Sequence, residues 1–133
     1  EELDRIVERD PSWTPGRYYN GVVRLKLKQY RPALVQFDQA VKLAPTNGAL
    51  LRARGLAHAE AGNYRDALAD YDAVLALEPT RTDAMNYKAN VLRKLGKKKE
   101  AKQVLARALE LDPKNRLARA TMEFLEFQGS SKL

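Results

Sequence analysis

Small and bulky apolar residues recur at fixed places along the chain with a regular period. Four equally spaced prolines mark this period, and the segments that lead to them read IVERDP, AVKLAP, VLALEP and ALELDP, ending at Pro11, Pro45, Pro79 and Pro113. No stretch shows the sustained alternation of apolar and polar residues that a strand requires. An interval of about 34 residues is typical of repeat architectures, so a stack of similar helical units is predicted.

The aligned units 14–47, 48–81 and 82–115 share residue types at four places. The eighth place holds a small residue (Gly21, Gly55 and Ala89), and the twentieth holds alanine (Ala33, Ala67 and Ala101). The twenty-fourth place holds a bulky residue (Phe37, Tyr71 and Leu105), and the twenty-seventh holds alanine or valine (Ala40, Val74 and Ala108). Small side chains let two helix backbones approach closely, while a bulky neighbour fills the remaining space. Each unit is therefore predicted to be a pair of antiparallel helices.

Capping and turn residues predict where the helices begin and end. Side-chain oxygens suited to helix N-termini stand at the unit boundaries, at Thr14, Asn47, Thr82 and Asn115. Gly62 and Gly96 lie where a chain that leaves a helix often needs a positive φ. The expected helices span residues 2–9, 15–28, 31–43, 48–61, 65–77, 82–95, 98–111 and 116–128.

With these residue types at these places of the repeating unit, the chain resembles the tetratricopeptide repeat family. The helix-turn-helix unit of that family repeats every ~34 residues, with a small residue at place eight, alanine at twenty, an aromatic residue at twenty-four and proline at thirty-two. The resemblance implies an all-α, right-handed superhelical solenoid, with three complete repeats over the units above. The chain departs from the family at the fourth and seventh places, where tryptophan and leucine are frequent; here they hold Arg17, Leu51 and Met85, and Asn20, Arg54 and Lys88.

The two ends of the chain do not form complete units. Residues 1–13 match the second helix of a preceding repeat, which fits a native chain that begins earlier, and residues 129–133 resemble a linker. Residues 116–128 are predicted to form a capping helix, because the place expected to be small holds Glu123. Its broad apolar arc has two explanations, a frayed end covered by the tail, or a docking or self-association patch formed by Met122, Phe124 and Phe127.

The resemblance implies that the first helix of each repeat lines a concave groove. Its lining changes from aromatic and aliphatic to polar and basic, which suits a peptide with an apolar segment followed by acidic or carboxylate groups. Amides and a guanidinium at the polar end can bind a peptide backbone and a carboxylate, although an ordinary solvated face has the same composition. The predicted peptide-binding residues are Tyr18, Tyr19, Val22, Leu25, Arg52, Leu56, Asn86, Tyr87, Asn90 and Arg93.

Some family members bind the C-terminal carboxylate of heat-shock chaperones through a clamp of lysine, asparagine and arginine side chains. The corresponding places here hold Tyr18, Val22, Ala53, Asp83 and Tyr87. The clamp is therefore absent, and the resemblance does not imply chaperone binding of that kind.

The net charge of +7 is concentrated in residues 81–119, which contain 12 Lys and Arg residues but only 4 Asp and Glu residues. This predicts an acidic partner or an anionic surface, or only a solvated turn. Nucleic acid is not expected, because no aromatic residues alternate with the central cations. These cations form a basic patch of Arg93, Lys94, Lys97, Lys98, Lys99 and Lys102.

The sequence offers no constellation for catalysis or metal binding. It has no cysteine and one histidine, His58, which is expected to pack between helices. No enzyme, cofactor or metal is therefore predicted. No apolar run is long enough to span a membrane, and the compartment is left open with the cytoplasm favoured. The predicted function is a non-catalytic scaffold for a protein or peptide ligand, and the alternative is homo-oligomerisation through the C-terminal helix or the groove.

Overall fold

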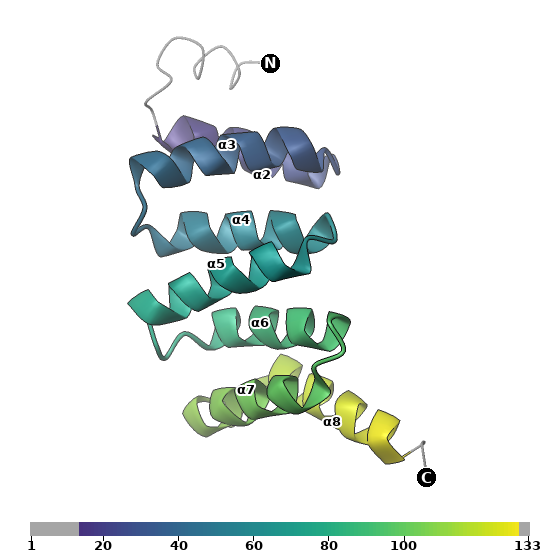
Figure 1. Cartoon of the computed structure of the whole chain (residues 1–133). Coiled ribbons are helices and arrows are strands. Elements are labelled where there is room, and N and C mark those ends of the chain that lie inside the picture. Colours follow the sequence, from purple (N-terminus) through teal and green to yellow (C-terminus); the bar gives the residue numbers. More distant parts are fainter. Residues whose placement is uncertain (1–13, 131–133) are drawn as a thin grey trace.

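The computed structural model describes residues 14–130, which form seven helices stacked in chain order (Figure 1). The helices are α2 (Thr14–Lys26), α3 (Tyr30–Leu43), α4 (Gly48–Glu60), α5 (Tyr64–Leu77), α6 (Thr82–Lys94), α7 (Lys98–Leu111) and α8 (Arg116–Ser130). The described residues contain no strand, so the all-α prediction is confirmed. The helix ends lie within two residues of the predicted bounds, and α8 continues into the predicted tail. The helix expected over 2–9, and the partial repeat over 1–13, lie outside the described residues.

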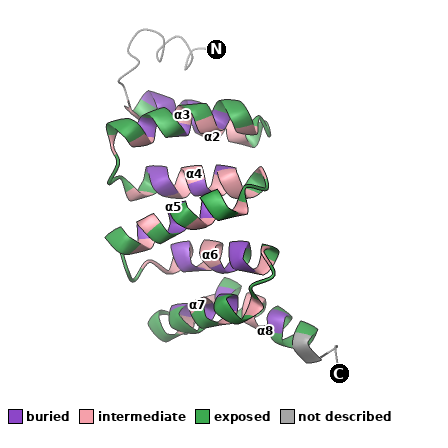
Figure 2. Ribbon diagram, in the orientation of Figure 1, coloured by how far each residue is buried: buried purple, intermediate pink, exposed green. Residues whose placement is uncertain are grey.

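The helices pack in consecutive pairs, α2 with α3, α4 with α5 and α6 with α7, and each pair contacts the next. Buried residues occur in every described helix (Figure 2), and they cluster between neighbouring helices. The nine residues at the twentieth, twenty-fourth and twenty-seventh places are all at most 1% exposed. The period found in the sequence therefore marks the core of the stack.

The glycines at the eighth place are required by the rings that face them. A Cβ atom on Gly21 would lie 2.6 Å from Cε1 of Phe37, and one on Gly55 would lie 2.7 Å from Cε1 of Tyr71. Both distances are far shorter than van der Waals contact, so only glycine fits against these rings. In the third pair the twenty-fourth place is leucine, and the eighth place is alanine.

The turns within the helix pairs confirm the two predicted glycine positions. Gly62 and Gly96 have φ values of 85° and 78°. The equivalent residue of the first pair, one repeat before Gly62, is Lys28, and it also has a positive φ, 59°. A side chain in this left-handed conformation brings Cβ too close to the following carbonyl oxygen. The first turn is therefore strained where the other two are not.

Replacing Lys28 with glycine should raise the free energy of unfolding by about 0.5–1 kcal/mol. The substitution removes a left-handed penalty of about 1–2 kcal/mol, part of which is offset by the greater entropy of glycine in the unfolded chain. Urea unfolding measures the difference. The matched control is Lys42→Gly in the last turn of α3, which should lower stability by about 0.5 kcal/mol. Destabilisation by both substitutions would contradict the assignment of strain to Lys28.

Two of the predicted N-caps are confirmed. Asn47 Oδ1 accepts hydrogen bonds from the backbone N–H groups of Ala49 at 3.1 Å and Leu50 at 3.3 Å. Asn115 Oδ1 accepts one from the N–H of Ala118 at 3.1 Å. These bonds satisfy donors that have no partner inside the helix, and so they set the starts of α4 and α8.

The prediction that Thr82 caps the N-terminus of a helix is wrong. Thr82 is itself the first residue of α6, and the preceding Arg81 makes no capping bond with its side chain. Instead, Arg81 Nε donates to Asp83 Oδ1 at 2.9 Å, and this oxygen also accepts from the N–H of Ala84 at 2.8 Å. A carboxylate in the first turn is favoured by the positive end of the helix dipole. Thr14 likewise lies within a helix, α2.

The charged residues at the seventh place, where the resembled family often has leucine, link successive helices. Arg54 of α4 donates to Asp70 of α5 at 2.7 Å from Nη2 and to Asp38 of α3 at 3.3 Å from Nη1. Lys88 Nζ of α6 lies 2.7 Å from Asp72 Oδ1 of α5. Asp38 and Asp72 are themselves one repeat apart. The ion pairs between units therefore recur with the same period as the core.

Candidate functional site

Side chains from α2, α3, α4 and α6 surround a hollow with a volume of about 370 Å³. Six of the ten predicted peptide-binding residues are in its lining: Tyr18, Val22 and Leu25 from the first unit, Arg52 and Leu56 from the second, and Tyr87 from the third. We call the side formed by the first helices α2, α4, α6 and α8 the groove face. The lining of the hollow consists of Tyr18, Val22, Leu25 and Lys26 from α2, Phe37 from α3, Arg52, Ala53, Leu56 and Glu60 from α4, and Tyr87 from α6.

Core rings support the half-buried rings that line the hollow. The ring centroids of Tyr18 and Phe37 lie 6.3 Å apart, and Tyr87 stacks on Tyr71 at 5.6 Å with an interplanar angle of 19°. Phe37 and Tyr71 are buried. Burial also raises the pKa of Tyr71, so its hydroxyl stays neutral. The aromatic wall is therefore held in one arrangement before any ligand arrives, which lowers the entropy cost of binding.

Charged side chains of both signs accompany these apolar walls. Arg52 Nη1 lies 2.6 Å from Asp83 Oδ2. Partial burial opposes ionisation of Asp83, but hydrogen bonds from Arg81 and Arg52 outweigh it and hold its pKa below the usual value. Lys26 and Glu60 are exposed parts of the lining. Arg52 is thus largely neutralised, and the hollow offers an apolar anchoring site without a net cationic clamp.

Four predicted peptide-binding residues lie outside the hollow. Tyr19, which is 54% exposed, lines a separate depression near the N-termini of α2 and α4. Asn86 Nδ2 donates to Asn115 Oδ1 at 3.2 Å, and Arg93 Nη2 donates to Asn90 Oδ1 at 2.8 Å. The structure therefore places Asn86 at the junction of α6 with the start of α8.

The C-terminal helix continues the row of first helices. It contacts α7 and α6, as α6 contacts α5 and α4. Phe124 follows Asn90 by one repeat, and Phe127 follows Arg93 by the same interval. The two phenylalanines thus occupy the ninth and twelfth places, and they are 46% and 70% exposed. The same period, applied to residues 116–128, is the sequence signal that places them beside the groove.

A direct contact joins the basic patch to the predicted docking patch. The guanidinium carbon of Arg93 lies 5.7 Å from the centroid of the Phe124 ring, within the range of a cation–π interaction. Met122, the third residue of the predicted docking patch, is only partly exposed and packs against the core between α6 and α7. The exposed part of that patch is therefore aromatic and borders Arg93.

The opposite side of α8 is charged. Its fourth, eighth and eleventh places hold Arg119, Glu123 and Glu126, which are all exposed. In α6 the same places hold residues buried against α7, namely Met85, Ala89 and Leu92. The surplus apolar surface of α8 therefore lies on the groove face, and not where the second helix of a further repeat would pack.

A family model described as a tetratricopeptide repeat matches residues 52–116. The chain contains tetratricopeptide repeats. The tetratricopeptide repeat (TPR) domain of Arabidopsis OM64 is 23% identical, with a TM-score of 0.78 over 84% of this chain and 93% of that one. The first TPR of Spaghetti (RPAP3), solved with the HSP90 peptide SRMEEVD, is 23% identical, with a TM-score of 0.81 over 88% and 93%.

MamA shares the same TPR architecture at lower sequence identity. It is 16% identical, with a TM-score of 0.88 over 97% of this chain and 75% of that one. No curated protein matches the chain. These likenesses show that the fold is a TPR solenoid.

The five residues at the clamp places line the hollow or form an ion pair. Tyr18, Val22, Ala53 and Tyr87 line the hollow, and Asp83 is paired with Arg52. None of these five side chains is cationic, so the hollow cannot hold a terminal carboxylate in the way that the chaperone clamp does.

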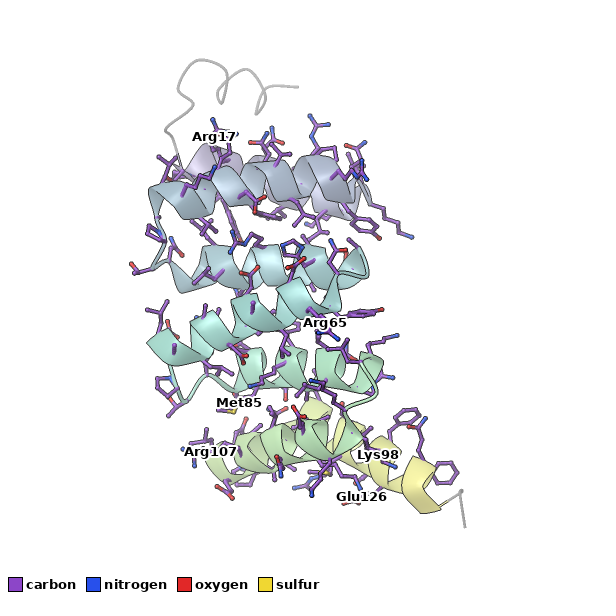
Figure 3. The ribbon with its side chains drawn as sticks, viewed as in Figure 1. Arg17, Arg65, Met85, Lys98, Arg107 and Glu126 are labelled. Atoms are coloured by element: carbon purple, nitrogen blue, oxygen red, sulfur yellow. The ribbon has the colours of Figure 1, made fainter. Side chains whose placement is uncertain are left out.

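The basic patch surrounds the turn between α6 and α7 of the third TPR. Lys94, Lys97 and Lys99 are exposed, whereas Lys98 is partly buried. Lys98 stands at the start of α7 (Figure 3). Among the described residues, none of Lys94, Lys97 and Lys99 forms an ion pair. The turn therefore contributes uncompensated positive charge next to Arg93.

The remaining candidate residue, His58, lies in the last turn of α4 and is half-buried. Its Nδ1 lies 3.4 Å from Nδ2 of Asn63, between α4 and α5. Residues 14–130 hold no cluster of three side chains suited to a metal ion. They also include no helix with the length and apolar character to cross a bilayer.

Proposed function

We propose that this TPR protein is a non-catalytic interaction scaffold whose groove face binds a segment of another polypeptide. The observation that carries the proposal is the hollow of about 370 Å³, walled by apolar side chains from three successive first helices. Ligand sites are typically concave, about 300–1,000 Å³ in volume, and mostly apolar with a few polar groups. A large aliphatic or aromatic side chain of the partner would fit within it.

The relatives support a peptide ligand, and the lining changes its expected chemistry. The first TPR of Spaghetti (RPAP3) was solved with the peptide SRMEEVD, which ends in acidic residues. In this chain, tyrosine and valine stand at three of the clamp places and line the hollow. We therefore expect the main anchor of the partner to be an apolar side chain rather than a terminal carboxylate.

Self-assembly by stacking a second copy onto α8 is less favourable. That contact would bury Arg119, Glu123 and Glu126, which are exposed in the structure. Removing charges from water without matched partners costs several kcal/mol per ion. The charged end of the stack therefore argues against end-to-end growth of the solenoid.

Replacing Leu56 with aspartate tests the proposal. Leu56 lines the hollow but belongs to none of the core clusters, so the substitution alters the binding surface more than the fold. Peptides are first selected from a random phage-displayed library on the unmodified chain. Synthetic copies should bind the variant at least about tenfold more weakly in fluorescence polarisation, because a carboxylate in an apolar site costs more than about 1.4 kcal/mol.

The matched control is Leu77→Asp, which changes an exposed leucine of α5 outside the lining. It should leave the affinity unchanged, and circular dichroism checks that both variants keep their helices. Equal affinities for the unmodified chain and the Leu56 variant would remove the hollow as the binding site. A library that yields no binding peptide would count against the scaffold itself.

A further inference from the structure

We propose that α8 and α6 form a second binding subsite on the groove face, specific for a large apolar side chain next to a carboxylate. We call it the aromatic subsite, and it consists of Asn90, Arg93, Phe124 and Phe127. The inference rests on the proposed function, since it assigns a second contact to the same ligand. The occupant we commit to is an acidic–apolar segment of a partner polypeptide.

The apolar part of the subsite is built from two exposed rings. Phe124 and Phe127 occupy the ninth and twelfth places, in line with Val22 and Leu25 of the hollow. Phe127 is 70% exposed, more than any other large apolar residue that the structure describes. Neither ring is needed for the core, because Ala118 and Leu125 provide the buried contacts of α8. Exposed aromatic surface of this kind is a feature of interaction sites.

The polar part of the subsite is a cation that is held in place but not neutralised. Arg93 lies against the Phe124 ring and donates one hydrogen bond to Asn90. No carboxylate pairs with it among residues 14–130, and its other N–H groups remain available to a ligand. Lys94 and Lys97 are exposed nearby in the sequence and add positive potential. A carboxylate is therefore the complementary group, and Arg binds it in a bidentate manner.

The charges of α8 also decide between a partner segment and a stacked copy of this chain. The exposed side that would face a following helix carries Arg119, Glu123 and Glu126, whereas the rings lie on the groove face. A ligand that runs along the groove reaches the rings without burying those charges. The positive field of residues 81–119 would also draw an acidic segment toward this end.

The register relates the two subsites to each other. Leu56 of the hollow and Phe124 both occupy the ninth place and are two units apart. Packed helices lie about 8–10 Å apart, so two steps along the row of first helices cover about 20 Å. An extended chain spans this with about six residues. The preferred ligand therefore has two large apolar side chains separated by roughly that length of chain, with Asp or Glu beside one of them.

Three variants test the aromatic subsite with peptides selected on the unmodified chain from a random phage-displayed library. The double variant Phe124→Ala/Phe127→Ala should weaken binding at least about tenfold. Arg93→Gln should weaken it at least about fivefold and flatten its dependence on salt, because a charge contact is lost. Leu77→Ala is the matched control, an apolar truncation of similar exposure on α5, and should have no effect. The selected peptides should share the two apolar anchors and the acidic residue.

The outcomes separate this inference from the proposed function. If Leu56→Asp weakens binding and the double variant does not, the hollow stands and the aromatic subsite is overturned. If both leave binding unchanged, both sites fall. Sedimentation equilibrium examines the other possible occupant, a second copy. A dimer of the unmodified chain that becomes monomeric in the double variant would also overturn the inference, because the rings would then belong to a self-contact.

Discussion

Replacing Arg54 with alanine should lower the free energy of unfolding by about 3 kcal/mol. Arg54 binds Asp70 through Nε and Nη2, and the Asp70 side chain is only 6% exposed. Its removal leaves a buried carboxylate without its main partner, and breaking such a pair typically costs about 3–5 kcal/mol. The lower end applies here, because the Arg54 side chain is 24% exposed and water can replace part of it. Urea denaturation followed by circular dichroism measures the loss.

Two further variants test whether the loss comes from leaving the Asp70 carboxylate buried without its main partner, or from losing an ion pair of any kind. Lys88→Ala removes the equivalent link one unit later, but its partner Asp72 is half exposed, so the loss should stay below about 1 kcal/mol. The double variant Arg54→Leu/Asp70→Leu should recover most of the stability, because a well-packed apolar pair can replace a buried ion pair. A loss below about 1 kcal/mol for Arg54→Ala would contradict the role assigned to this pair.

Replacing Gly55 with alanine should cost about 2 kcal/mol, although alanine is the better helix former by about 1 kcal/mol. The added Cβ would lie 2.7 Å from the ring of Tyr71 and 3.2 Å from Cβ of Asp70. Tyr71 is 1% exposed and stacked on Tyr87, so it cannot move aside without disturbing the hollow. Overpacking of this kind costs about 1–3 kcal/mol, and the upper end applies because the ring is held in place. Subtracting the gain in propensity of about 1 kcal/mol leaves a net loss of about 2 kcal/mol.

The third helix pair supplies the compensating change. Its eighth and twenty-fourth places are alanine and leucine. Gly55→Ala combined with Tyr71→Leu should therefore be more stable than the sum of the two single effects by at least about 1 kcal/mol. Gly48→Ala on the same helix is the matched control, because its Cβ would meet nothing closer than 3.6 Å. Equal effects of alanine at positions 48 and 55 would show that the ring contact does not limit this place.

Most of the fold could be predicted because the period lies in residues whose size matters locally. The glycine at place eight faces the bulky residue at place twenty-four within one helix pair, and the glycines of the turns supply a positive φ. The strained turn at Lys28 and the capping of α6 were not visible in this way. A lysine residue does not indicate a positive φ. At the start of α6, the hydrogen bond to the backbone is accepted by the carboxylate of Asp83, which Arg81 and Arg52 stabilise, and not by Thr82.

The site was predicted less completely, since its decisive contacts join different units. The apolar end follows from the family register, and six predicted residues surround the hollow. The pairing of Asn86 with Asn115 and the contact of Arg93 with Phe124 connect α6 to α8. Residue types alone do not reveal such pairings, because asparagine and arginine are equally common on solvated faces. The same period puts Phe124 and Phe127 at the ninth and twelfth places, which the prediction for residues 116–128 did not use.

The groove face is proposed as the surface that receives a partner, and its response to a bound peptide can be observed residue by residue. Amide chemical-shift mapping of the ¹⁵N-labelled chain, titrated with the tightest selected peptide, provides that observation. We expect the largest changes at Val22, Leu56 and Tyr87 around the hollow, extending to Phe124 on α8. Changes confined to the second helices α3, α5 and α7 would place the partner elsewhere and contradict the proposal.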